Sequence, residues 1–194
     1  MEFRNKVWIE YRINKNTICF RCSDIGNIPV ATAINEFLQN LSKGKKAFLH
    51  GYRLEEEELP KMVETGASME KAEMLYDPSH VFLDASDAKI NIHHLECACE
   101  AFVFYFDRKV KWTDFLASSY IHRPKKYIKY IIRDLVNYIK AGILSAYFVS
   151  MDHGADFWFE CGKDQEENVL ALLQTLSNLG CIVKQVRRLS FLHH

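Results

Sequence analysis

The two ends of this chain follow the same pattern, and that pattern constrains the fold more than any other feature. Residues 6–54 and residues 143–190 each read as strand, tight turn, strand, helix, strand. Few residues are identical between them, so the likeness lies in the order of the elements and the period of the apolar side chains. We therefore predict an α+β fold built from two ββαβ repeats related by pseudo-twofold symmetry.

The first repeat carries its signals in the expected order. Apolar and polar side chains alternate over residues 7–13, as they do in a half-buried strand. Asn14 and Asn16 favour a hairpin turn because asparagine tolerates a positive φ, and a second alternating strand follows. Pro29 suits the first turn of a helix. Gly44 suits the left-handed position just beyond a helix end, and a third strand follows it.

The second repeat offers matching signals. Residues 152–154, with the sequence Asp-His-Gly, supply the turn, and apolar residues alternate in the strand after it. Asp164 can cap the next helix, with Glu167 as its capping-box partner. Gly180 ends that helix, and residues 181–189 form the closing strand.

Residues 55–142 separate the two repeats. We predict that they form a largely helical insert within one domain that spans residues 1–194. The strands of both repeats would share one mixed or antiparallel sheet, with the two repeat helices covering one face. A fully helical insert with two separate small sheets is the alternative.

The insert itself gives weaker signals. Residues 55–76 read as one or two short acidic helices, and residues 81–83 as a short strand. Residues 90–106 fit a helix, although the apolar run 101–106 alone would also fit a buried strand. Pro124 opens the clearest helix of the chain.

Composition favours a cytoplasmic protein. No apolar run approaches the ~20 residues needed to cross a bilayer, so no membrane contact is expected. The first residues mix acidic and basic side chains with apolar ones, which does not fit a signal peptide. Six cysteines lie mostly in apolar patterns, which suits buried, reduced thiols. His193 and His194 resemble the start of an affinity tag, and no function is assigned to them.

Net charge is zero, but the charges are unevenly placed. Residues 55–77 hold eight acidic and two basic side chains, whereas residues 107–140 hold nine basic and three acidic ones. Such separation can steer a charged partner. The alternatives are that the two segments face each other or form ordinary solvated helix faces.

No residue pattern points to a familiar catalytic or cofactor site. The chain lacks G-x-S-x-G, the glycine-rich phosphate motifs and H-E-x-x-H, so no cofactor is expected. Cys19 and Cys22 form a C-x-x-C, but residues three apart on a strand face opposite sides. The turn at residues 152–156 holds acid–base side chains that a hairpin favours anyway.

The densest group of metal-ligand side chains lies between residues 93 and 100. On a helix, His93 and Cys97 would sit four residues apart and could share a Zn²⁺ ion. A closed site needs four ligands, and the sequence offers no second pair at a familiar spacing. We therefore predict no metal site, while metal binding by His93, His94, Cys97 and Cys99 is left open.

Residues 120–133 interleave basic and aromatic side chains. Lysine and arginine neutralise phosphates, and tyrosine can stack on bases. The helix start beside Pro124 also offers free N–H groups to an anion. The plain alternative is a solvated helix face with tyrosines at the edge of the core. The candidate anion-binding or partner-binding residues are His122, Arg123, Lys125, Lys126, Lys129 and Arg133.

The leading functional expectation is a non-enzymatic, cytoplasmic binding protein that uses a charged surface against another protein, as an adaptor, an inhibitor or an immunity-type partner does. The lack of catalytic motifs and the separation of charge motivate it. A nucleic-acid-binding module that uses residues 120–133 is the second expectation. An enzyme whose site is scattered along the sequence is the third. The oligomeric state is left open.

Overall fold

The computed structural model describes residues 6–52, 68–74, 80–84, 91–97, 100–107, 135–152 and 155–189. These residues contain two α-helices and nine strands whose first and last residues are given below, and residues 135–140 are also helical. The helices are α1 (Ile28–Ser42) and α5 (Glu166–Asn178), and the short 3-10 helices are η2 (Ile92–Cys97) and η4 (Lys163–Gln165). The strands are β1 (Trp8–Ile13), β2 (Thr17–Cys22), β3 (Lys46–Tyr52), β4 (Ser68–Met74), β5 (His80–Asp84), β6 (Glu100–Phe106), β7 (Ala146–Met151), β8 (Asp156–Gly162) and β9 (Ile182–Gln185).

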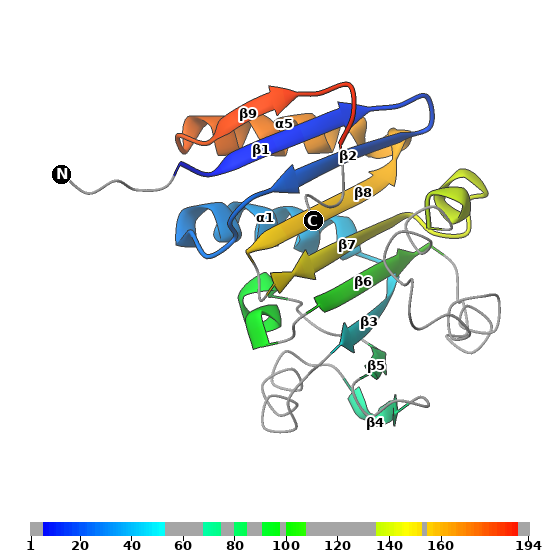
Figure 1. Ribbon diagram of the computed structural model, residues 1–194. Helices are drawn as coiled ribbons and strands as arrows, with labels where there is room; N and C mark the ends of the chain where they lie inside the picture. Colours follow the sequence, from blue (N-terminus) through cyan, green and yellow to red (C-terminus); the bar gives the residue numbers. More distant parts are fainter. Residues whose placement is uncertain are drawn as a thin grey trace.

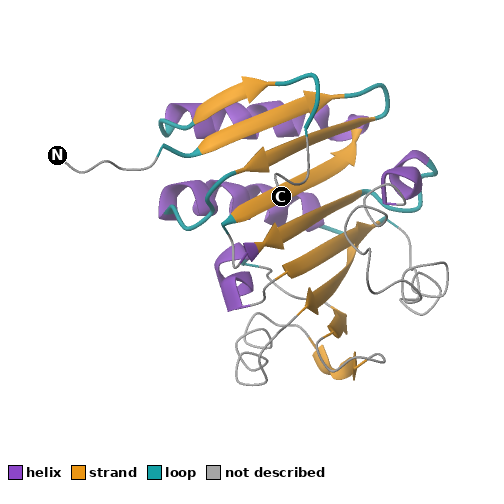
Figure 2. Ribbon diagram, viewed as in Figure 1, coloured by secondary structure: helices purple, strands orange, loops and turns teal. Residues whose placement is uncertain are grey.

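The nine described strands form one mixed sheet in the order β4-β5-β3-β6-β7-β8-β2-β1-β9. Neighbouring strands run antiparallel, except that β9 pairs in parallel with β1. Helices α1 and α5 lie behind the same face of this sheet (Figures 1 and 2). The predicted α+β class and the single mixed sheet are therefore confirmed.

The two end segments contain the same order of elements, β1-β2-α1-β3 and β7-β8-α5-β9. Their strands do not have equivalent neighbours, however. β9 pairs directly with β1, whereas β6, from the segment between them, lies between β7 and β3. The antiparallel pair of β2 and β8 joins the two segments at the middle of the sheet.

Local chemistry explains the hairpins and the helix ends. The β1–β2 turn closes with a bond from the Asn14 amide to the Thr17 carbonyl, 2.8 Å long. Asn27 caps α1, because its side chain accepts a hydrogen bond from the amide of Val30. Gly44 and Gly180 follow the ends of α1 and α5 with φ of 72° and 89°, as predicted.

The predicted cap of α5 at Asp164 is wrong. Asp164 lies inside η4, two residues before the first residue of α5. The N-cap of α5 is Gln165, whose side chain makes no capping bond. The Asp164 carboxylate instead accepts a hydrogen bond from the Gln165 side chain. Glu166 and Glu167 still place negative charge in the first turn of α5, where the helix dipole favours it.

The prediction of a largely helical insert is wrong for the part that the structure describes. Residues 68–74, expected to be helical, form the strand β4, and residues 100–106 form β6 rather than the end of a helix. Among the described residues between 91 and 106, helical structure is confined to η2. The short strand expected at residues 81–83 is confirmed as part of β5.

Apolar side chains bury both faces of the sheet. One cluster lies under α1 and α5 and includes Phe20, Phe148 and Phe159. The second cluster lies on the opposite face, where Leu135 and Ile139 from the 135–140 helix pack with the aromatic side chains of β6. Strands β6, β7 and β8 are therefore buried on both sides along nearly their whole length.

Candidate functional site

The six binding residues predicted from the basic aromatic segment, His122, Arg123, Lys125, Lys126, Lys129 and Arg133, lie outside the described residues. Most of the acidic run at residues 55–77 also lies outside them. Within the described chain, three other places gather chemistry-bearing side chains. They are the C-x-x-C with the buried cluster beside it, the groove between α1 and α5, and the sheet edge formed by β1 and β9.

The C-x-x-C is not a metal or redox pair in this fold. Cys22 packs in the cluster under the helices, whereas Cys19 belongs to the cluster on the opposite face. Both are free thiols, and burial raises the pKa of each to about 12. The prediction that the two side chains face opposite sides of a strand is thus confirmed.

The histidine–cysteine cluster lies on η2, a 3-10 helix, rather than on an α-helix. In this geometry residues three apart line up, so the backbone of η2 is not the α-helix on which residues four apart would share one face. Cys99 lies outside the described residues, as do His153 and Gly154 of the β7–β8 turn. Among the described side chains, no three His, Cys, Asp or Glu residues are placed to hold a metal ion.

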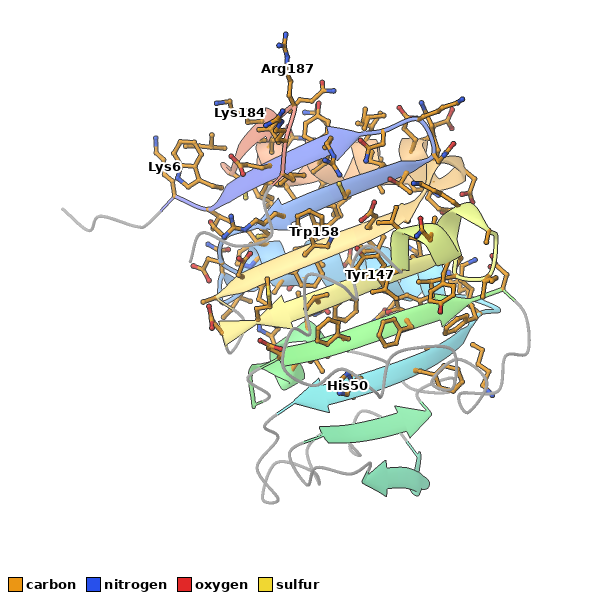
Figure 3. The ribbon with its side chains drawn as sticks, turned by 45° about the vertical axis from the view of Figure 1, so that its right-hand side comes forward. Lys6, His50, Tyr147, Trp158, Lys184 and Arg187 are labelled. Carbon is orange, nitrogen blue, oxygen red and sulfur yellow. The ribbon has the colours of Figure 1, made fainter. Side chains whose placement is uncertain are left out.

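A buried carboxyl, Glu160, lies on the face of β8 that points away from α1 and α5. Its side chain is 1% exposed and accepts a hydrogen bond of 2.8 Å from the hydroxyl of Tyr147, which is fully buried. Burial raises the pKa of Glu160 above its ordinary value, while hydrogen bonds from Thr17 and Tyr147 and the charge of Arg12 oppose that rise. Figure 3 shows Tyr147 and Trp158 on this face.

This buried cluster is better suited to holding the sheet together than to catalysis. Cys19 on β2 and Tyr147 on β7 are the register partners of Glu160 on the two adjacent strands. A general acid must reach a substrate within hydrogen-bond distance, and these side chains are sealed under the second apolar cluster. The hydrogen bond between Tyr147 and Glu160 instead links β7 to β8.

The groove between α1 and α5 has a volume of about 500 Å³. Its lining combines apolar side chains such as Phe37 and Leu172 with Glu36, Lys43 and Lys45. Among the described residues that line it, none is a cysteine, serine or histidine. Lys45 is also engaged in an ion pair with Asp107.

Exposed cations gather along the sheet edge made by β1 and β9. Lys6 precedes β1, Lys184 lies within β9, and Arg187 and Arg188 follow it; all four side chains are exposed. Figure 3 shows Lys6, Lys184 and Arg187 along this margin of the molecule, with Arg187 projecting away from the sheet. We call these four residues the basic edge.

An aromatic side chain lies beside the basic edge. Trp8 is 50% exposed, and its register partner in β9 is Ile182. The next pair along the two strands on the same face joins Glu10 to Lys184. On β2, the guanidinium of Arg21 binds the carboxylate of Asp156 at 2.6 Å, which fixes the neighbouring surface. Tryptophan and arginine are the residue types that most often dominate binding energy at protein interfaces.

Sequence reasoning did not identify the basic edge. Its members come from opposite ends of the chain, and only the parallel pairing of β1 with β9 brings them together. The local signal was the cluster of Lys184, Arg187 and Arg188 in and after the last predicted strand.

Comparison with models of known families, with curated proteins and with solved structures gives no match for this chain. None of the helices within the described residues has the length and apolar character needed to span a membrane.

Proposed function

We propose that this chain is a non-enzymatic, cytoplasmic binding protein that holds an acidic protein partner against its basic edge. The observation that carries the proposal is that Lys6, Lys184 and Arg187 lie along one margin of the sheet, with the exposed Arg188 next to Arg187 in the chain. A local excess of one charge raises the rate of encounter with an oppositely charged partner.

Trp8 favours a protein partner because it adds apolar contact area to the charged edge. Electrostatic attraction at a surface is screened by salt, and exposed ion pairs contribute only ~0.2–1 kcal/mol each. A half-exposed tryptophan adds apolar area that a partner can bury. Basic side chains on the same sheet edge as an exposed aromatic side chain have the composition of a protein interface.

The position of the basic edge in the sheet also favours a protein over a nucleic acid. Among the described strands, β9 is the last one in the sheet order, and a terminal strand presents backbone groups that another polypeptide can pair with.

The architecture supports a further part of the proposal, that the two ββαβ segments are one repeated unit related by a pseudo-twofold axis. Phe20 and Phe159, which hold equivalent positions in the two repeats, are register partners where β2 pairs with β8. The order of elements makes β3 the counterpart of β9, although a twofold between β2 and β8 would place β6 opposite β9 in the sheet. β3 has neighbours on both sides, β6 and β5, whereas β9 has only β1 among the described strands.

The test is a binding panel at two salt concentrations. The probes are an alternating Glu–Val peptide, a mixed-sequence single-stranded DNA and a mixed-sequence RNA. The proposal predicts salt-sensitive binding of the peptide and weaker binding of both nucleic acids. The variant Lys184→Glu with Arg187→Glu should lose peptide binding, whereas Lys15→Glu with Lys43→Glu, which reverses two exposed cations elsewhere, should keep it.

Tighter binding of the DNA or RNA than of the peptide would replace this proposal with the nucleic-acid one. Equal losses in the edge variant and in the control variant would show that binding follows net charge rather than the basic edge. Either result contradicts the proposed function.

A further inference from the structure

The backbone of β9 has one side engaged and one side directed outward. The amide of Ile182 donates to the Val7 carbonyl at 3.0 Å, and the amide of Val186 donates to the Tyr11 carbonyl at 2.9 Å. Backbone groups alternate in direction along a parallel strand. Val183 and Gln185 therefore direct both their N–H and C=O groups away from β1.

The described part of the sheet has no strand on that outward side of β9. Val183 packs partly against the cluster under the helices, so its side chain holds β9 in place. The Tyr11 hydroxyl adds a hydrogen bond of 3.5 Å to the side chain of Gln185. The strand is thus anchored on one side, with two outward N–H groups and two outward C=O groups on the other.

The charges around this edge select among the polypeptides that could pair with it. Lys184 lies in the middle of β9, and Arg187 and Arg188 lie just beyond its end. Lysine on an edge strand discourages pairing with another copy of the same edge, because like charges would meet. A strand that carries carboxylates would instead meet opposite charges along its length.

We propose that an extended acidic segment of the protein partner adds to this sheet as a new strand beside β9, pairing with the outward backbone groups of Val183 and Gln185. This inference rests on the proposed function and adds its binding mode. Main-chain hydrogen bonds would supply affinity, and the basic edge would supply selectivity for carboxylates, as in other cases of strand addition.

The test compares Gln185→Pro with Gln185→Ala. Both variants remove the side chain that bonds to Tyr11, but only proline removes the outward N–H group. Proline is tolerated on an edge strand where the N–H points to solvent. The alternating Glu–Val peptide should bind Gln185→Pro about fivefold more weakly than Gln185→Ala, the effect expected for a lost backbone hydrogen bond.

A second peptide tests strand addition on the wild-type protein, so the result does not depend on whether the Gln185 variants fold. An alternating Glu–Pro peptide carries the same charge spacing, but its prolines cannot donate backbone hydrogen bonds. Wild-type protein should bind it at least about fivefold more weakly than the Glu–Val peptide. Thermal melting of both Gln185 variants checks that each is folded.

Equal binding of the two peptides by the wild type overturns strand addition, as does equal binding of the Glu–Val peptide by two folded Gln185 variants. The proposed function survives either result if Lys184→Glu with Arg187→Glu still abolishes binding. If the charge reversal has no effect, the proposed function fails as well, so the two failures are distinguishable.

Discussion

Tyr147→Phe tests whether the buried carboxyl holds the middle of the sheet together. The substitution removes one hydroxyl and leaves the ring in place among its neighbours. That hydroxyl donates a 2.8 Å hydrogen bond to Glu160, and both side chains are at most 1% exposed. Water cannot replace the lost donor, so the carboxyl oxygen stays buried without it. We expect a loss of about 1–3 kcal/mol in the free energy of unfolding.

The assay is thermal and chemical unfolding of the wild type and the variant. For a chain of this length, the expected loss lowers Tm by roughly 3–9 °C. Tyr105→Phe is the matched control, because Tyr105 is buried on the helix-covered face and burial alone raises its pKa. It should lose less stability than Tyr147→Phe.

A double-mutant cycle with Glu160→Gln isolates the interaction between the two side chains. We expect a coupling free energy of about 1 kcal/mol or more. A coupling near zero, or equal losses for Tyr147→Phe and Tyr105→Phe, would refute the view that Tyr147 acts through Glu160.

Three further results are expected. Burial raises the pKa of Glu160 in the folded state, so the contribution of this side chain to stability is complete below the ordinary glutamate pKa and is lost as pH rises through the raised pKa. In denaturant titrations across that pH window, the free energy of unfolding of Glu160→Gln should therefore rise relative to that of the wild type. A difference between the two that does not change with pH would contradict this. Cys19 and Cys22, with pKa values raised by burial to about 12, should react with thiol reagents at neutral pH only as fast as the protein opens, whereas rapid labelling of the native protein would show that they are accessible. Gly180→Ala should lower the free energy of unfolding by about 1–2 kcal/mol because φ is 89° there, whereas Ser177→Ala, at an exposed position of α5, should change it little; equal effects would mean that the backbone at residue 180 is not constrained.

The end segments could be predicted because their signals are local. The Asn14 turn, the proline near the start of α1, and the glycines after α1 and α5 each act within a few residues of the chain. The sequence around β1 also indicates which side chains are buried and which are exposed. Val7, just before β1, and Ile9 are buried under the helices while Trp8 between them is half exposed, which gives the two-residue alternation.

The middle of the chain could not be predicted in this way because its pairing is long-range. β6 is buried on both faces, so its apolar run from Ala101 to Phe106 shows no alternation and resembles a buried helix equally well. What makes it a strand is the pair of neighbours β3 and β7, which lie far away in sequence. β4 pairs instead with β5, its neighbour in the sequence, but with an irregular register.

The candidate site shows the same division between local and long-range information. The separation of Cys19 from Cys22 followed from strand geometry alone and is confirmed. The basic edge could not be predicted, because it depends on the parallel pairing of β1 with β9, which brings Lys6 close to the cations in and after β9. No short sequence motif indicates that pairing. The predicted binding segment at residues 120–133 lies outside the described residues and stays a prediction.

The central claim is that an acidic polypeptide binds at the β9 edge, and amide hydrogen exchange measured residue by residue tests it most directly. In the free protein, the amides of Ile182 and Val186 should exchange slowly, because they bond to β1, while those of Val183 and Gln185 should exchange quickly. Saturation with the alternating Glu–Val peptide should slow exchange at Val183 and Gln185. Unchanged fast exchange at these two amides, with the peptide demonstrably bound, would contradict the account.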